Sequence, residues 1–306
     1  MKKKYMVLRT FSLILLSLLL IKTTAFAQAD STEAVVEEKP TDSPVRAAFE
    51  SGLLFDAATT TLQPSKTLEM IIQHRFGVIE NGIHDFYGIW APSNIRLGMN
   101  YSILDNLSVG IGATKYNKME DVQLKYRLFE QTRSNSMPVT VMLYGVVGID
   151  GSADTKWQES YKFSNRMSYF SQIIVSRRFN DHLSLQFAPG FTHYNSVDSL
   201  YDHDKISLSF AGRYKFTPQG SFIFSGDFPL QIQGISEHSK AFNDEADHPK
   251  ANICVGFEVS TSTHAFHIYL ASAQGILPQE DIMWNKNDFF KGEFLIGLNV
   301  TRLWNF

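Results

Sequence analysis

Apolar and polar residues alternate with a period of two through most of this sequence, from about residue 67 to its end. Residues 107–114 read LSVGIGAT, residues 205–216 read KISLSFAGRYKF, and residues 252–259 read NICVGFEV. Because successive side chains of a β-strand point to opposite faces, a strand separates the two sets, whereas a helix would mix them. The alternation therefore predicts an all-β fold for this part of the chain.

Counting such segments predicts about twelve strands. Their expected bounds are 68–77, 93–101, 107–115, 121–130, 138–147, 165–178, 183–191, 205–216, 221–229, 251–260, 264–272 and 291–303. Bounds deduced from such patterns carry an error of about two to four residues. The segment 165–178 is the least regular, because apolar residues fill both of its faces.

The expected connections alternate in length along the chain. The short ones are 102–106, 179–182, 217–220 and 261–263, with a somewhat longer 131–137, and the long ones are 78–92, 148–164, 192–204, 230–250 and 273–290, with 116–120 as a short exception. Transmembrane barrels place short turns on the periplasmic side and long loops outside. We therefore predict a transmembrane antiparallel up-and-down β-barrel with short periplasmic turns and long extracellular loops.

The first 27 residues have the three parts of a secretory signal. A basic start precedes an apolar run from Phe11 to Ile21, and the small-residue site Ala25-Phe26-Ala27 follows. That run is too short for a bilayer span of about 20 residues, and no later segment has 18 consecutive apolar residues. Only helices and closed barrels satisfy every backbone hydrogen bond in hydrocarbon. We expect a cleaved signal peptide over 1–27 and a barrel in the outer membrane of a Gram-negative bacterium.

Residues 28–66 are expected to form a partly disordered periplasmic leader ahead of a barrel domain at 67–306. Residues 28–46 are polar, with acidic side chains and two prolines, and favour a flexible tail. Residues 47–66 are more apolar but have no clear period. Two interpretations stay open for this stretch: it enters the mouth of the barrel or packs below it, or it is a linker without structure.

Charged residues on the polar strand faces are candidates for the lining of the lumen, because a charge facing lipid costs about 2–4 kcal/mol at the bilayer midplane. These candidates are Glu69, Arg75, Arg96, Lys125, Arg127, Arg213, Lys215, Asp227, Glu258 and Glu293. Six are basic and four are acidic. They predict either a mildly cationic lumen that favours anions, or a paired charge network that fills a narrow barrel and conducts little.

Aromatic residues near the expected strand ends are candidates for the rings that flank the apolar band of membrane barrels. They are Trp90, Trp157, Trp284, Trp304 and Phe306. The terminal Phe306 also continues the apolar parity of the last strand. We expect it to be the signal that the barrel-assembly machinery reads, with outer-membrane lipid and small solutes as the other partners.

Other chemistry has little support. The net charge of −3 gives no basic excess for nucleic acid, and a single cysteine, Cys254, excludes a disulfide framework or a multi-cysteine metal site. Acids and histidines gather in the expected outer loops at 193–204, 237–248 and 280–288, but without the spacing of a known metal motif, so solvated loops are favoured and no cofactor is expected. His182 and Ser184 share a strand face, yet they lie at an inner turn, on the wrong side for an enzyme acting on outer lipid.

Several stretches of the first half resemble a known family. Residues 72–77 read IQHRFG, 86–88 FYG, 94–101 NIRLGMNY, 105–112 DNLSVGIG, 125–128 KYRL and 137–139 MPV. Together they resemble the Bacteroidota outer-membrane β-barrel proteins grouped as domain of unknown function 5777, over about residues 47–147. Where that family usually continues Phe-Gly with Leu-Asp, this chain has Ile89-Trp90. The resemblance implies a fold and a location, and no activity.

The functional hypothesis is passive or selective passage of small solutes through an outer-membrane barrel without enzymatic activity. Two alternatives remain. A barrel that does not conduct would serve as a structural or partner-docking protein, and a hydrolase active at the membrane rim would need a nucleophile and base there.

Overall fold

The structure is a computed structural model that describes residues 42–198, 201–232 and 248–306. The predicted signal peptide, the first part of the leader and most of the acidic loop at 237–248 lie outside these residues. Among the described residues, none of the helices has the length and apolar content needed to cross a bilayer.

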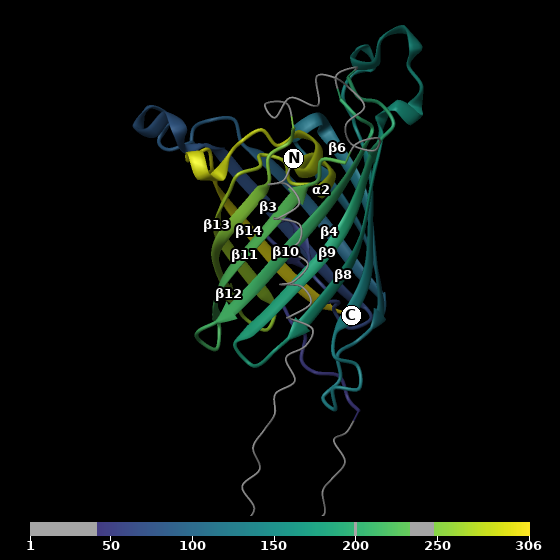
Figure 1. Cartoon of the computed structure of the whole chain (residues 1–306), viewed down its shortest axis with the longest axis vertical. Helices are drawn as coiled ribbons and strands as arrows, with labels where there is room; N and C mark the ends of the chain where they lie inside the picture. The colour runs from purple at the N-terminus through teal and green to yellow at the C-terminus, as the bar shows by residue number, and fades with distance from the viewer. Residues whose placement is uncertain (1–41, 199–200, 233–247) are drawn as a thin grey trace, which may run out of the picture. The chain divides into compact units, whose positions relative to one another are not determined.

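Twelve antiparallel strands form a closed barrel in which each strand pairs with its neighbours in sequence and the last pairs with the first (Figure 1). The strands are β3 (Thr67–Val78), β4 (Asn94–Leu104), β5 (Leu107–Thr114), β6 (Met119–Phe129), β7 (Thr140–Ile149), β8 (Met167–Arg178), β9 (Leu183–Tyr194), β10 (Asp204–Lys215), β11 (Gly220–Pro229), β12 (Asn252–Ser260), β13 (His264–Ala271) and β14 (Leu295–Asn305). The predicted fold class and strand number are confirmed.

Alternation of burial along the strands shows which side chains face the lumen. In β3 every second residue is buried, from Thr67 through Arg75 to Gly77. The residues that alternate with the buried ones along the wall strands include exposed apolar side chains such as Ile111 and Phe257. An apolar exterior with a polar interior is the pattern of a barrel surrounded by lipid.

The connections differ between the two ends of the barrel, as predicted. Short turns and the C-terminus lie at one end, and the longer connections extend from the other (Figure 1). These longer connections carry the short helices η1 (Ile79–Asp85), η3 (Asp154–Ser160), η4 (Phe163–Arg166), α2 (Pro278–Trp284) and η5 (Phe289–Lys291), while η2 (Tyr116–Lys118) joins β5 to β6. The strand β14 starts at Leu295, later than the predicted residue 291, because η5 turns the chain there and Gly292 adopts a left-handed φ of 86°.

The lumen contains a segment that the sequence left undecided between a linker and an insertion. Residues 48–62, hereafter the plug hairpin, are largely buried inside the barrel and include the two-residue strands β1 (Leu53–Leu54) and β2 (Ala57–Ala58). Phe55 turns the chain between them with a left-handed φ of 57°. The helix α2 occupies the lumen from the long-loop end, where its Ile282 is fully buried.

Two apolar clusters hold these inserted segments. The first joins Phe49, Leu54 and Phe55 of the plug hairpin to wall residues that include Cys254 and Tyr269. The second places Ala58 of the hairpin and Ile282 of α2 against wall residues from β7, β8 and β9: Met142, Tyr144, Val146, Phe170, Ile174 and Ala188. The inner wall is therefore polar with two apolar patches, and both patches are covered by the inserted segments.

Candidate functional site

Arg75 of β3 joins three parts of the molecule. Its guanidinium is fully buried, forms an ion pair with Asp56 of the plug hairpin, and lies 3.8 Å (Nη1 to Oδ1) from Asp281 of α2. The same group donates hydrogen bonds to the carbonyl oxygens of Ala273 and Gly275, in the loop that leads to α2. One wall side chain therefore fixes both the plug hairpin and the outer loop.

A second charge cluster lies where the plug hairpin enters the barrel. Arg213 of β10 donates to Glu258 of β12 (Nε to Oε1, 2.8 Å) and to Glu50 at the start of the hairpin (Nη2 to Oε1, 3.1 Å). The other carboxylate oxygen of Glu258 lies 3.1 Å from Nε2 of His267. Lys215 extends toward Glu50 at 3.9 Å. The hairpin is thus held by charge at its base as well as near its tip.

The remaining hairpin contacts use its backbone. Lys125 donates to the carbonyl of Gly52, and Glu69 accepts from the Gly52 amide at 3.1 Å. Gln73 and Asn299 both donate to the carbonyl of Phe55. Wall side chains therefore satisfy backbone groups of the hairpin that its two short strands leave unpaired.

The structure places the ten lumen candidates as follows. Glu69, Arg75, Arg96, Lys125, Arg213, Asp227 and Glu258 are buried within the barrel, Arg127 and Lys215 are half-buried near the short-turn end, and Glu293 precedes β14 and accepts from the amide of Asp288 at 2.6 Å. Arg96 pairs with Asp121 within the wall (Nη2 to Oδ1, 2.7 Å), and Gly112 leaves the space that this pair occupies.

The lumen also contains acids that were not among the ten candidates. They are Glu50, Asp56, Asp121, Glu280 and Asp281, and all of them face the lumen or its inserted segments. Four of these five acids come from the leader and from the outer loop that carries α2, whose place inside the barrel no local pattern indicated. Arg75, Arg96 and Arg213 pair with members of this set, so a network of paired charges lies inside the barrel.

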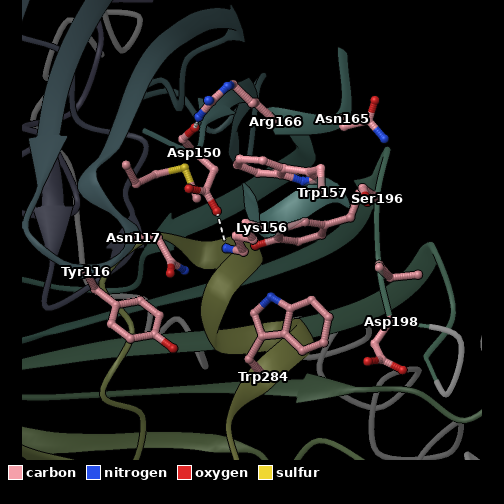
Figure 2. A pocket seen from close by; sticks show the side chains of 13 residues that line it. Tyr116, Asn117, Asp150, Lys156, Trp157, Asn165, Arg166, Ser196, Asp198 and Trp284 are labelled. Carbon is pink, nitrogen blue, oxygen red and sulfur yellow. Dashed lines mark hydrogen bonds and ion pairs between the residues drawn. The ribbon is translucent and has the colours of Figure 1, made fainter. Parts of the chain in front are cut away.

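A cavity of about 770 Å³ lies at the long-loop end, and we call it the vestibule. Its lining residues are Tyr116, Asn117, Met119, Asp150, Lys156, Trp157, Asn165, Arg166, Tyr194, Ser196, Val197, Asp198 and Trp284 (Figure 2). Helix η3 supplies Trp157, and α2 supplies Trp284 at its last residue. The vestibule therefore lies beside the same helix that Arg75 ties to the plug hairpin.

Five aromatic residues were predicted to flank the apolar band of the barrel, and two of them, Trp157 and Trp284, line the vestibule. The ring of Trp157 is covered by the guanidinium of Arg166 at 4.5 Å, and the ring of Trp284 packs edge-on against Tyr194 at 5.4 Å. Both residues come from the long connections. Trp90 is 75% exposed on an outer turn, Trp304 lies under Arg302 at 4.8 Å, and Phe306 is 79% exposed.

His182 and Ser184, which share a strand face, make separate contacts in the structure. The Nδ1 atom of His182 lies 2.7 Å from the carbonyl oxygen of Lys215, and Ser184 is buried in the wall. Within the described residues, no hydrogen bond joins His182 to Ser184. In that same part of the chain, no group of three or more His, Cys, Asp or Glu side chains is arranged to hold a metal ion.

Burial makes the stability of α2 depend on pH. It raises the pKa of Glu280 to about 7, although the amides of Ile276 and Leu277 oppose the shift. It also raises the pKa of Asp281, to about 8, where desolvation outweighs the attraction of Arg75. A raised carboxyl pKa means that folded protein keeps a proton which the unfolded chain loses, so this contribution to stability is present at low pH and is lost as the pH rises through 7 to 8.

We therefore expect α2 to loosen between pH 7 and pH 8. Protease cleavage within the outer loop 273–290 should accelerate over this interval in protein reconstituted in liposomes. Glu280→Gln mimics the protonated acid and should move the midpoint upward, toward the pKa of Asp281. An unchanged midpoint in this variant would contradict the assignment to Glu280.

Comparison with known proteins gives a family and a set of structural neighbours. A family model described as a membrane-bound beta barrel domain, DUF5777, matches residues 49–304. Among solved structures, NanC porin is 10% identical and covers 77% of this chain and 98% of its own, with a TM-score of 0.46. An outer membrane channel from Pseudomonas putida F1 is 14% identical over 80% and 97% of the two chains, with a TM-score of 0.44.

A third neighbour, KdgM porin, is 6% identical over 77% of this chain and 98% of its own, with a TM-score of 0.44. No curated protein matches the sequence. The matched family residues begin inside the plug hairpin and end in β14, so the family model includes the inserted segment as well as the barrel wall.

Proposed function

Since the chain belongs to the membrane-bound β-barrel family DUF5777, we propose that it passes small solutes across the outer membrane through a lumen which the plug hairpin closes at rest. The apolar outer face and the segregation of short and long connections support the outer membrane as its location. Small solutes and outer-membrane lipid are then its partners, and the exposed Phe306 is available to the assembly machinery. No catalytic role is part of this proposal.

One observation carries the proposal: the segments that fill the lumen do not belong to the barrel wall. Each of the twelve strands pairs with two neighbours without any contribution from the plug hairpin. The hairpin joins the wall covalently at one point, through residues 63–66 ahead of β3. It can therefore leave the lumen without breaking any backbone hydrogen bond between wall strands, which a strand of the barrel could not do.

Energetics favour a lumen that is closed most of the time. Phe49, Leu54 and Phe55 are almost completely buried, and each contributes about 1.5–3 kcal/mol when removed from water. Every 1.4 kcal/mol changes a population by about tenfold. Spontaneous opening is thus rare, and passage requires an event that offsets this cost.

A reversible cross-link tests the proposal. The Sγ atom of Cys254 on β12 lies 3.8 Å from Oδ2 of Asp56, so a cysteine at position 56 is within reach of it. Asp56→Cys also removes a partner of Arg75. In planar bilayers we expect this variant to open more often than the native chain under reducing conditions and to fall to baseline when oxidised.

Asp56→Ser is the matched control, because it removes the same carboxylate without adding a thiol. Its openings should be frequent and independent of the redox state. If neither variant opens in any condition, passage through a movable plug is contradicted.

A second candidate, a barrel that does not conduct, is favoured by the two apolar patches of the inner wall. The wall residues Ala211, Ile223 and Leu295 are apolar and pack with the plug hairpin in one core cluster. Apolar side chains at these positions are not expected in the lining of a water-filled pore. Under this alternative, removal of the hairpin destabilises the barrel and yields no defined conductance.

A further inference from the structure

Aromatic residues from separate loops line the vestibule. The indole of Trp157 comes from the connection between β7 and β8, and the indole of Trp284 comes from the connection between β13 and β14 (Figure 2). Tyr116 and Tyr194 add phenol rings. The face of such a ring carries partial negative charge and attracts weakly positive C–H groups. A ligand with flat C–H faces suits this lining.

The charged groups of the vestibule bond to other groups of the protein. Arg166 donates to the Tyr161 hydroxyl, to the carbonyls of Asp150 and Ser152, and to the carboxylate of Asp154. Lys156 pairs with Asp150, and Asp198 also has a partner. With both cations and both acids engaged, the lining offers no unpaired charge to an ionic ligand. The occupant that fits is therefore neutral.

Neutral hydrogen-bonding groups remain available. The hydroxyl of Tyr194 is buried beside Ser168 and Trp284 and borders the cavity. The side chains of Asn117 and Ser196 also line the cavity, and among the described residues they form no hydrogen bond. A ligand hydroxyl can act as donor or acceptor to each of these groups.

We propose that the vestibule binds a neutral sugar ring. Its C–H faces lie on the indole of Trp284 and the ring of Tyr116, and its hydroxyls bond to Tyr194, Asn117 and Ser196. The volume of about 770 Å³ falls within the range of about 300–1,000 Å³ that small-ligand sites occupy. As the solute class of the channel, this inference rests on the proposed function, although binding itself is measured without passage.

Tryptophan fluorescence of the detergent-solubilised full chain provides the test, with maltose as the neutral ring probe. Mannitol carries similar hydroxyls without a ring, and glucuronate carries a ring with a carboxylate. We expect a saturable change with maltose, no saturable change with mannitol, and weaker binding of glucuronate. A response shared equally by mannitol, or a preference for glucuronate, would overturn the proposal.

Variants locate the binding site. Tyr116→Ala and Trp284→Ala each should raise the Kd for maltose by about tenfold or more, as the loss of a central aromatic contact does. Trp90→Ala is the matched control, since Trp90 is exposed and does not line the vestibule. Because Tyr116 and Trp284 come from different connections, misfolding of α2 in one variant leaves the other informative. Equal affinities in all three variants would contradict the site.

The two proposals fail in different ways. If maltose binds and the barrel never conducts, the sugar site stands and passage is wrong. If the barrel conducts through a movable plug but maltose does not bind, passage stands and the assigned ligand class is wrong.

Discussion

Removing residues 48–62 should convert a barrel that is almost always closed into an open pore. The deletion takes away the only described segment that enters the lumen from the short-turn end, and it leaves all twelve wall strands intact. Three buried apolar side chains at about 1.5–3 kcal/mol each imply that the frequency of opening rises by a factor on the order of 10³ or more. Single-channel recording in planar bilayers measures this increase directly.

A folding control accompanies that experiment, because the deletion exposes apolar wall residues to water. Folded membrane barrels migrate differently on gels before and after boiling, and the deleted chain should retain this difference. Phe55→Asp is a milder second variant, since it places a charge in the cluster that contains Tyr269 and keeps the chain length. A folded deletion variant with no more openings than the native chain would rule out the plug as a gate.

Arg75→Met should produce the largest effect of any single substitution. It leaves the carboxylate of Asp56 buried without its cation, and breaking a buried pair in this way costs about 3–5 kcal/mol. The loop carbonyls of Ala273 and Gly275 lose their donor at the same time. We expect both the plug hairpin and α2 to loosen, seen as more frequent openings and faster proteolysis of the outer loop.

Arg127→Met provides the matched control for this substitution. Arg127 points to the same side of the wall, but it lies near the short-turn end and pairs with Glu130 (2.9 Å), which is partly exposed. Such pairs contribute about 0–1 kcal/mol. A double variant, Arg75→Met with Asp56→Asn, should recover part of the loss, because the carboxylate that has lost its cation is removed as well. Equal effects of Arg75→Met and Arg127→Met would show that the buried contacts of Arg75 do not hold the plug hairpin and α2.

The barrel wall could be predicted from the sequence because alternation is a local property. In a segment such as 107–114, the alternation alone indicates which residues share a face of the strand. The structure has β5 at Leu107–Thr114. The inward direction of Arg75 and Glu258 followed from the same parity. Only the bounds at irregular ends were misplaced, as at β14, where a glycine turn replaces the expected first residues of the strand.

The contents of the lumen could not be predicted, because their partners are remote in sequence. The hairpin sequence LLFDAA has no period long enough to identify it, and its stability depends on Arg75, Tyr269 and Asn299. The acidic residues of α2 were interpreted as part of a solvated loop, since nothing nearby indicates that Arg75 pairs with Asp281. A signal was present in Asp56 alone, a single acid within an apolar stretch, which often marks a buried pair.

The reactivity of Cys254 tests most directly whether the plug hairpin fills the lumen. This residue is the single cysteine of the chain, it is completely buried, and the hairpin side chains Phe55 and Asp56 lie in its surroundings. With a water-soluble maleimide on folded protein, we expect negligible labelling of the full chain, rapid labelling after deletion of residues 48–62, and intermediate labelling of Arg75→Met. Rapid labelling of the folded full chain, at the rate of the deletion variant, would contradict a lumen closed by this hairpin.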